Sequence, residues 1–367
     1  MDFPSQGSDQ DQHTANSIAA RVLTSISASL SMFGALVIIL TYFAWKDIRT
    51  VSRQILVFIS IADFLTAFGN MMSALWRERS DSDTPCVVQS FITTCSSLWS
   101  FFWTTFLALF LNVMIVKRRP VLAEKAMFLF HLFAWGLPLV ITITAATWKG
   151  NKINGTSYRG VLGNSKDQGS AGWCWIRHDL PKKEIVTWML VTGKAWEIAA
   201  YILITLLYFI LKYYIHQEVY HRSQHFTPES YLEAAMRADR KLTFVPVIFL
   251  LLRIWGTTRF LLYAFGDTTH NETWMVYLQG IGDSGQGFAN FLLFCCLTER
   301  FKTRLWKAFM IWFECCRRWK SPGETSSHTV YRNKGVHKGL ERKVNDERSP
   351  LLASMENHPP NILRDNN

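Results

Sequence analysis

Seven stretches of this chain are apolar over about 20 residues or more, and this repetition limits its possible folds more than any other feature. A bilayer core about 30 Å thick needs about 20 apolar residues per helical crossing, because lipid offers the backbone no hydrogen-bonding partner. We therefore predict an all-α membrane protein, a bundle of seven transmembrane helices. The predicted spans are residues 20–43, 54–75, 86–116, 126–148, 184–214, 242–264 and 274–297.

Lysine and arginine gather on one side of this predicted bundle, which sets its orientation. They follow the first span, separate the third span from the fourth and the fifth from the sixth, and recur after residue 300. On the other side residues 1–19 and the loop before the seventh span have none, although the loop 149–183 is a mild exception. We expect a multi-pass protein of the plasma membrane with its N-terminus outside the cell and its C-terminus in the cytoplasm. The net charge of +11 then reflects topology and attraction to anionic membrane lipid, and does not indicate nucleic-acid binding.

Two of the seven cysteines, Cys86 and Cys174, fall on the predicted outer side, which is oxidising. Cys174 stands between two tryptophans in a loop, and Cys86 lies at the outer mouth of the third span. We expect them to form a disulfide, which contributes about 4 kcal/mol in the chain-entropy model. The bond would draw Trp173 and Trp175 over the mouth of the bundle, where an apolar ring with one polar N–H suits a half-wet site.

Several longer runs resemble a known family. They include ISIADFLTA in the second span, WMLVTGKAWEIAAY in the fifth, RKLTFVPVIFLLLRIWGTTRFLL around the sixth and QGIGDSGQGFANFLLF in the seventh. With the staple between the third span and the following loop, they resemble the cyclic-AMP-receptor-like and secretin-like G-protein-coupled receptors over about residues 20–310. The resemblance implies a receptor that passes a signal from an unknown extracellular ligand to a heterotrimeric G protein. The rhodopsin-like Asn-Pro-x-x-Tyr motif is absent from the seventh span.

Ionisable residues inside the predicted spans balance in charge, and each costs at least about 2.5 kcal/mol at mid-depth unless it finds a partner. They are Asp63, Glu197, Asp283, Lys194, Arg253 and Arg259. Both a polar lock between helices and an exchange of partners during activation explain this balance. On the second interpretation Asp63, Arg253 and Asp283 form an intramembrane switch, with Glu197 and Asp283 as the alternative partners of Arg253.

A ligand pocket is predicted beside these charges. Its expected lining is Trp99, Trp103, Trp188, Lys194, Glu197, Arg259 and Gln279. We expect no enzyme activity, no metal and no cofactor. The G-x-G-x-x-G pattern from Gly280 to Gly285 follows no predicted strand, so it indicates close helix packing and not a dinucleotide site.

Outside the spans, residues 1–19 are expected to form an extracellular segment without the basic leader of a cleaved signal peptide. Residues 298–316 predict an amphipathic juxtamembrane helix on the inner leaflet, and residues 317–367 a disordered cytoplasmic tail. Both Asn154 and Asn271 match the glycosylation pattern, and we expect glycan on Asn154, because Asn271 lies only three residues before the seventh predicted span. Palmitoylation is expected at Cys315 and Cys316.

Two other classes of protein would also explain such a chain. A transporter, or an ion or proton pathway protein, would use balanced intramembrane charges, but no inverted repeat is visible and the number of spans is odd. The second class is a scaffolding membrane protein that binds no ligand.

Overall fold

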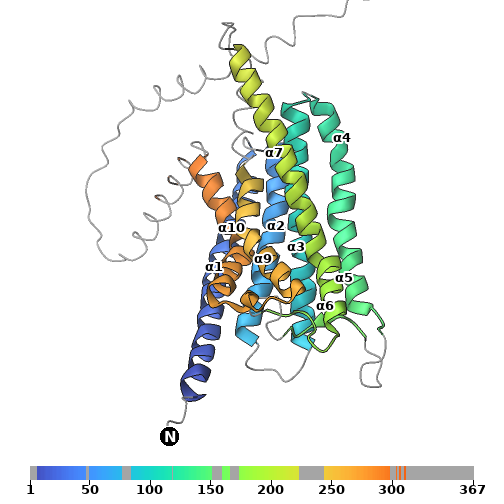
Figure 1. Ribbon diagram of the computed structural model, residues 1–367. Helices are drawn as coiled ribbons and strands as arrows, with labels where there is room; N and C mark the ends of the chain where they lie inside the picture. The colour runs from blue at the N-terminus through green and yellow to red at the C-terminus, as the bar shows by residue number, and fades with distance from the viewer. Residues whose placement is uncertain are drawn as a thin grey trace, which may run out of the picture. The chain divides into compact units, whose positions relative to one another are not determined.

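The computed structural model describes residues 6–46, 49–76, 84–117, 119–150, 159–165, 173–222 and 244–297, together with Thr303, Trp306 and Met310. The chain divides into two compact units, residues 1–306 and 307–367. The first unit contains a bundle of long helices (Figure 1).

Each of the seven predicted spans is helical over nearly all of its described residues. The first three spans are the single helices α1 (Gln6–Ala44), α2 (Val51–Trp76) and α3 (Thr84–Ile115). The fourth span combines α4 (Pro120–His131), the π-helical turn η2 (Leu132–Gly136) and α5 (Leu137–Thr147). The fifth combines α6 (Lys182–Met189), the π-helical turn η3 (Leu190–Lys194) and α7 (Ala195–Arg222). The last two are α9 (Phe244–Phe265) and α10 (Thr273–Leu297), joined by the short helix η4 (Thr268–Asn271).

Six of these spans are long and apolar enough to cross a membrane, by length and composition. The seventh, α10, has 25 residues but carries polar side chains such as Gln279, Asp283 and Gln286, which are buried against other helices. Large apolar side chains remain exposed on the outside of the bundle, including Leu40 and Phe209. Lipid, which needs no hydrogen bonds, is the solvent that suits such a surface.

Small residues allow the helices to approach one another closely. Helix α1 packs along α10 and α2, α2 packs on α3, and α9 packs on α10. A Cβ atom on Gly34 would lie 2.8 Å from Phe291 Cβ, and one on Gly69 would lie 2.5 Å from Thr93 Cγ2. The backbone N–H of Gly287 donates to Ser31 Oγ at 2.9 Å. Glycines in the seventh span therefore serve packing, as the sequence indicates.

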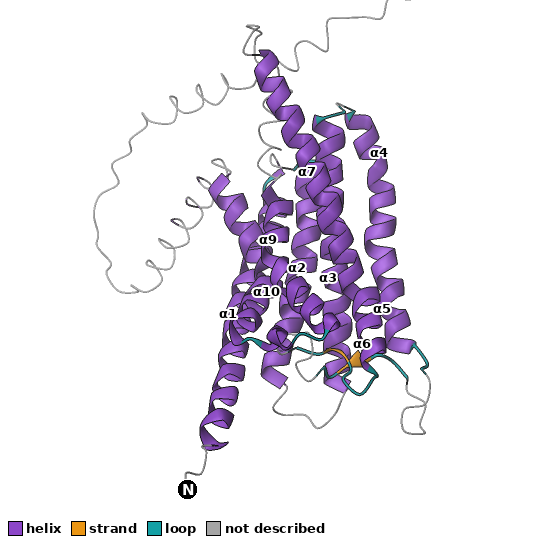
Figure 2. Ribbon diagram, viewed as in Figure 1, coloured by secondary structure: helices purple, strands orange, loops and turns teal. Residues whose placement is uncertain are grey.

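A small sheet adds to the predicted all-α fold. Strands β1 (Leu162–Gly163) and β2 (Trp175–Ile176) pair antiparallel, with Leu162 opposite Ile176 (Figure 2). Both strands contact α3. We call this end of the bundle, which also carries the disulfide, the disulfide end.

Several predictions concern residues outside the described ranges. They are the amphipathic helix and tail beyond Leu297, apart from Thr303, Trp306 and Met310, which are helical, and the sites Asn154, Cys315 and Cys316. Asn271 ends η4, but its side chain is not described. Helix α1 begins at Gln6, so the predicted N-terminal segment is helical from there.

Candidate functional site

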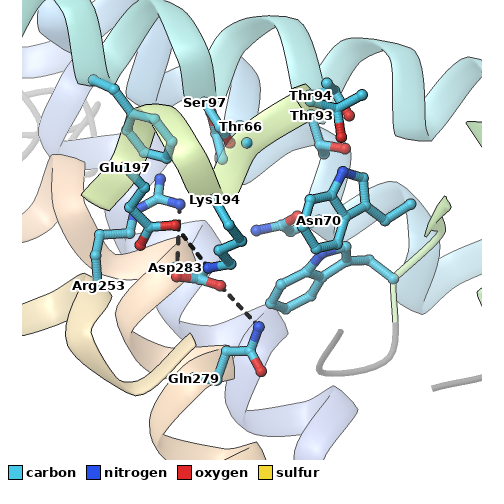
Figure 3. A pocket seen from close by; sticks show the side chains of 15 residues that line it. Thr66, Asn70, Thr93, Thr94, Ser97, Lys194, Glu197, Arg253, Gln279 and Asp283 are labelled. Atoms are coloured by element: carbon cyan, nitrogen blue, oxygen red, sulfur yellow. Dashed lines mark hydrogen bonds and ion pairs between the residues drawn. The ribbon is translucent and has the colours of Figure 1, made fainter. Parts of the chain in front are cut away.

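A cavity of about 510 Å³, including its mouth, lies at the disulfide end among α2, α3, η3, α7, α9 and α10 (Figure 3). Hydroxyl, amide, charged and aromatic groups share its walls. The lining residues are Thr66, Asn70, Thr93, Thr94, Ser97, Phe101, Trp173, Trp175, Thr192, Gly193, Lys194, Glu197, Arg253, Gln279 and Asp283.

The predicted disulfide between Cys86 and Cys174 is present and holds the loop before α6 against the start of α3. The backbone N–H of Cys174 donates to Gln89 Oε1 on α3 at 2.8 Å, which fixes the loop a second time. The flanking Trp173 and Trp175 both line the cavity. The bond therefore places two indole rings in the wall of the cavity, as the sequence predicts.

The π-helical turn η3 sets the inward face of the fifth span. It spans Leu190–Lys194 and includes Gly193, where a Cβ atom would lie 3.1 Å from the ring of Trp175. A π-turn uses an extra residue per turn and so rotates the side chains before it relative to those after it. Thr192, Gly193 and Lys194 all line the cavity through this turn.

Lys194 and Glu197 form the first ion pair of the cavity, as their spacing predicts. Lys194 Nζ lies 2.7 Å from Glu197 Oε2, and Tyr201 Oη donates to Glu197 Oε1 at 2.6 Å. Both carboxylate oxygens of this buried glutamate are thus hydrogen-bonded. Tyr201 also lies 3.2 Å from Thr257 Oγ1, which links α7 to α9.

Arg253 and Asp283 form the second ion pair, across α9 and α10. Arg253 Nη1 lies 3.5 Å from Asp283 Oδ1, and Gln279 Nε2 donates to Asp283 Oδ2 at 3.2 Å. The structure thus pairs Arg253 with Asp283 and leaves Glu197 to Lys194, which decides between the two predicted partners. All four charged side chains are no more than 8% exposed.

Two glycines make room for this cluster. A Cβ atom on Gly282 would lie 2.1 Å from the carbonyl oxygen of Leu252, so α9 and α10 touch through their backbones next to the Arg253–Asp283 pair. A Cβ atom on Gly256 would lie 3.1 Å from Asp283 Oδ2 and 3.2 Å from Lys194 Nζ. Without side chains at these positions, the two ion pairs can share one site.

Three of the seven predicted pocket residues, Lys194, Glu197 and Gln279, line the cavity. The other four do not, and for the two on α3 the reason is helical spacing. The α3 positions that line it, Thr93, Thr94, Ser97 and Phe101, share one face, because 93, 97 and 101 are four residues apart and 94 and 97 are three apart. Trp99 and Trp103 lie on a different face.

The two misplaced α3 tryptophans belong to an aromatic core against η2. Trp99 Nε1 donates to the Trp135 carbonyl at 3.2 Å, and the buried Trp103 ring lies 5.0 Å from His131 and 4.6 Å from Phe58, centroid to centroid. The turn η2 precedes Pro138, which cannot donate a backbone hydrogen bond. These tryptophans thus serve packing.

Trp188 and Arg259 also lie elsewhere than predicted. Trp188 packs on Trp148, with ring centroids 5.3 Å apart, and against an apolar cluster that includes Leu162 and Ile176 of the small sheet. Arg259 donates from Nε to the His270 carbonyl at 2.7 Å and from Nη1 to Gln279 Oε1. It therefore contacts the lining of the cavity through Gln279.

Asp63 lies in a different polar network from the Arg253–Asp283 pair, and its part in the switch stays a prediction. Its Oδ1 accepts from Ser100 Oγ at 2.8 Å, and its Oδ2 accepts from Asn290 Nδ2 at 3.0 Å. Gln286 Nε2 donates to the same Ser100 at 3.0 Å. Neutral donors from α3 and α10 therefore hold this carboxylate, whereas Arg253 holds Asp283.

Sequence reasoning missed the polar residues of α2 and α3 that line the cavity. Thr66 and Asn70 are four residues apart, and Thr94 and Ser97 are three apart, so each pair shares a helix face. Hydroxyl and amide groups at helical spacing within an apolar span were the available signal. Tyr201, which completes the contacts of Glu197, was also missed.

Comparison with known proteins gives consistent results. Residues 10–227 match the family described as slime mold cyclic AMP receptor. The human protein named G-protein coupled receptor 157 is 36% identical over 290 residues, which cover 78% of this chain and 82% of that protein. The mouse protein of the same name is 34% identical over 81% of this chain and 87% of its own length. Cyclic AMP receptor 1 of Dictyostelium discoideum is 25% identical over 40% of this chain and 33% of its own length.

Among solved structures, squid rhodopsin has the same fold, with a TM-score of 0.60 at 13% identity over 91% of this chain and 92% of its own. This likeness shows a seven-transmembrane bundle and nothing about the ligand. The similarity to named receptors over most of the chain also favours a receptor over the transporter alternative. The chain is a multi-pass membrane protein and belongs to the family of G-protein-coupled receptors that includes the slime mold cyclic AMP receptors and G-protein coupled receptor 157.

Proposed function

We propose that this receptor binds an extracellular small molecule in the cavity at the disulfide end and activates a heterotrimeric G protein at the opposite end. The disulfide end then faces outside the cell, and the protein acts at the plasma membrane with its C-terminus in the cytoplasm. The excess of Lys and Arg after the first span and between the third and fourth spans supports this orientation.

The Arg253–Asp283 pair is the observation that carries this proposal. It joins α9 to α10 in the wall of the cavity at the disulfide end. Helix α9 packs mainly on α10 and has little contact with α7. A ligand that changes the Arg253–Asp283 contact would therefore change the main support of α9, and a shift of α9 could reach the opposite end of the bundle.

Modifications and lipid contacts belong to the same proposal. The loop sites Asn154 in Asn-Gly-Thr and Asn271 in Asn-Glu-Thr would face outside and meet the glycosylation pattern. Cys315 and Cys316 would be acylated at the inner leaflet, where the segment after α10 would lie on membrane lipid. Of the two asparagines we expect glycan on Asn154, because Asn271 lies two residues before α10 and therefore close to the membrane.

Nucleotide exchange by a panel of purified Gα subtypes tests the function directly. The receptor, reconstituted without ligand in lipid nanodiscs, should accelerate exchange by at least one subtype above empty nanodiscs. The same receptor in liposomes should show no saturable flux of ions or small solutes. Flux without accelerated exchange would replace this proposal with a transport function.

A further inference from the structure

One edge of the Arg253 guanidinium group has no partner among the described residues. Its Nη1 faces Asp283, but its Nε and Nη2 are buried and make no hydrogen bond in the described part of the chain. These two nitrogens form one edge of the guanidinium fork, the geometry that binds a carboxylate or phosphate through two parallel hydrogen bonds. Arg253 is only 4% exposed, so two donors are unsatisfied in a wall of the cavity.

Unsatisfied buried donors are costly, at about 1–3 kcal/mol each. The neighbouring carboxylates offer little relief, because Glu197 already accepts from Lys194 and Tyr201, and Asp283 Oδ2 accepts from Gln279. Only Asp283 Oδ1 forms no hydrogen bond among the described groups. The site thus has two donors without a hydrogen bond on one edge of Arg253 and a hydroxyl without one, described below. Asp283 Oδ1 has only its long ion-pair contact with Arg253 Nη1 among the described groups.

The rest of the cavity suits an organic anion. The Arg253 guanidinium carbon lies over the Phe101 ring, 5.0 Å from its centre. This contact leaves the Nε–Nη2 edge, which lies in the plane of the guanidinium group, available for other contacts. Thr94 Oγ1 is buried without a described hydrogen-bond partner and lines the same cavity. Trp173 and Trp175 supply apolar ring faces. Figure 3 shows the charged residues on one side of the cavity and Thr93 and Thr94 on the other.

We propose that the ligand of this receptor is a small organic oxyanion, a carboxylate or a phosphate, whose charged group binds the Nε–Nη2 edge of Arg253. The bound oxyanion occupies an edge that Asp283 does not contact, but it neutralises the same guanidinium charge and so weakens the attraction between Arg253 and Asp283 that links α9 to α10. This inference rests on the proposed function for its signalling consequence, but the binding itself can be measured independently.

Simple aromatic acids test the binding. Phenyl phosphate and benzoate serve as the two probes, and benzyl alcohol is the uncharged match. Each is titrated against the purified receptor in nanodiscs while the unfolding temperature is recorded, because a ligand of the folded state raises it with concentration. Either acid or both should give a saturable rise, and benzyl alcohol should give none. Preference for one acid then identifies the phosphate or the carboxylate class.

Variants of Arg253 separate its charge from its geometry. Arg253→Lys keeps the charge but loses the bidentate edge, so the dissociation constant should rise at least tenfold. Arg253→Gln should remove binding altogether. Lys212→Gln removes a cation from an exposed position on α7 and should bind like the wild type. Should Arg253→Gln fail to fold, the comparison of Arg253→Lys with Lys212→Gln decides the question.

Three outcomes would overturn the inference: no saturable effect of either acid, an equal effect of benzyl alcohol, or wild-type affinity in both Arg253 variants. Basal nucleotide exchange, measured on the same nanodiscs without probe, keeps this result apart from the proposed function. Exchange without acid binding would reject only the ligand class. Acid binding without exchange on any Gα subtype would reject only the signalling function.

Discussion

Two buried carboxylates in the same bundle, Asp283 and Asp63, have very different surroundings. Asp283 lies in the wall of a cavity that three other charged side chains, from η3, α7 and α9, also line, and its contact with Arg253 is 3.5 Å long. Asp63 accepts hydrogen bonds of 2.8 and 3.0 Å from the neutral groups of Ser100 and Asn290 and does not line that cavity.

The difference indicates two separate roles. Every carboxylate oxygen of Asp63 has a short contact with a neutral donor, so any rearrangement would leave a buried group unpaired. The charge cluster consists of Lys194, Glu197, Arg253 and Asp283. In this cluster, by contrast, the long Arg253–Asp283 contact and the two nitrogens of Arg253 without hydrogen bonds allow partners to be exchanged at little cost. We therefore expect the Asp63 network to hold the bundle together and the charge cluster to respond to ligand.

The largest effect is expected at the glycine that supports the charge cluster. Gly282→Ala would place a methyl group 2.1 Å from the Leu252 carbonyl, so α9 and α10 must separate, at a cost of about 3 kcal/mol or more. Surface expression and unfolding temperature should both fall sharply. The control is Gly136→Ala, where a Cβ atom would meet nothing within 4 Å. Equal losses in the two variants would show that the close approach of α9 and α10 is unimportant.

A smaller loss is expected at the Asp63 network. Asp63→Asn replaces a carboxylate by a group with only one acceptor oxygen, so Ser100 or Asn290 loses its acceptor, at about 1–3 kcal/mol. The unfolding temperature should fall, while basal G-protein activation per surface receptor should not rise. A rise in activation would place Asp63 in the switch after all and remove the contrast with Asp283.

The charge cluster should respond in the opposite way. Asp283→Asn and Arg253→Gln each weaken one contact of the resting packing, and a change of about 1 kcal/mol corresponds to about fivefold in the balance of two states. Basal activation per surface receptor should rise by about that factor in each variant. The double variant should give no further increase, because both changes remove the same contact.

Basal activation is measured as nucleotide exchange divided by surface receptor number. If all three cluster variants lower expression and none raises exchange per receptor, the pair is a structural lock like the Asp63 network.

The smallest effect is expected at the partly exposed pair of Arg177 and Asp179, which shows how little stability a surface contact of this protein contributes. Hydrogen bonds from Arg177 lower the pKa of Asp179 below its ordinary value of 3.8, so the pair stabilises the fold above that pH and loses this effect as the pH falls through the lowered pKa. Because both side chains are partly exposed, Asp179→Asn should cost about 0.5 kcal/mol or less at pH 7. Unfolding temperatures of the variant and wild type should differ little at pH 7 and converge below pH 3.8.

The sequence alone was sufficient for the bundle, because long apolar runs have few alternatives in lipid. It was also sufficient for the Cys86–Cys174 bond and the Lys194–Glu197 pair, since the first follows from topology and the second from helical spacing. The pairing of Arg253 could be narrowed only to two candidates, because the choice depends on how far α9 and α10 approach each other.

The pocket was predicted less well. Trp99 and Trp103 were assigned to it by residue type, although their positions on α3 lie on a different face from Thr94 and Ser97. The rotation caused by the turn Leu190–Lys194 and the hairpin at Trp175–Ile176 could not be predicted from composition or periodicity. Both depend on tertiary contacts: the turn packs against Trp175, and the strands pack on α3.

The π-turn in the fifth span also affects how this chain should be compared with other receptors. A helix that crosses the same distance without such a turn needs one residue fewer. When this chain is aligned with a receptor that lacks the turn, the gap therefore belongs inside an apolar span, near Leu190–Lys194, although alignments usually place gaps in loops. An ungapped alignment would match Glu197 to the wrong helical face and would misassign the cavity residues on one side of the turn.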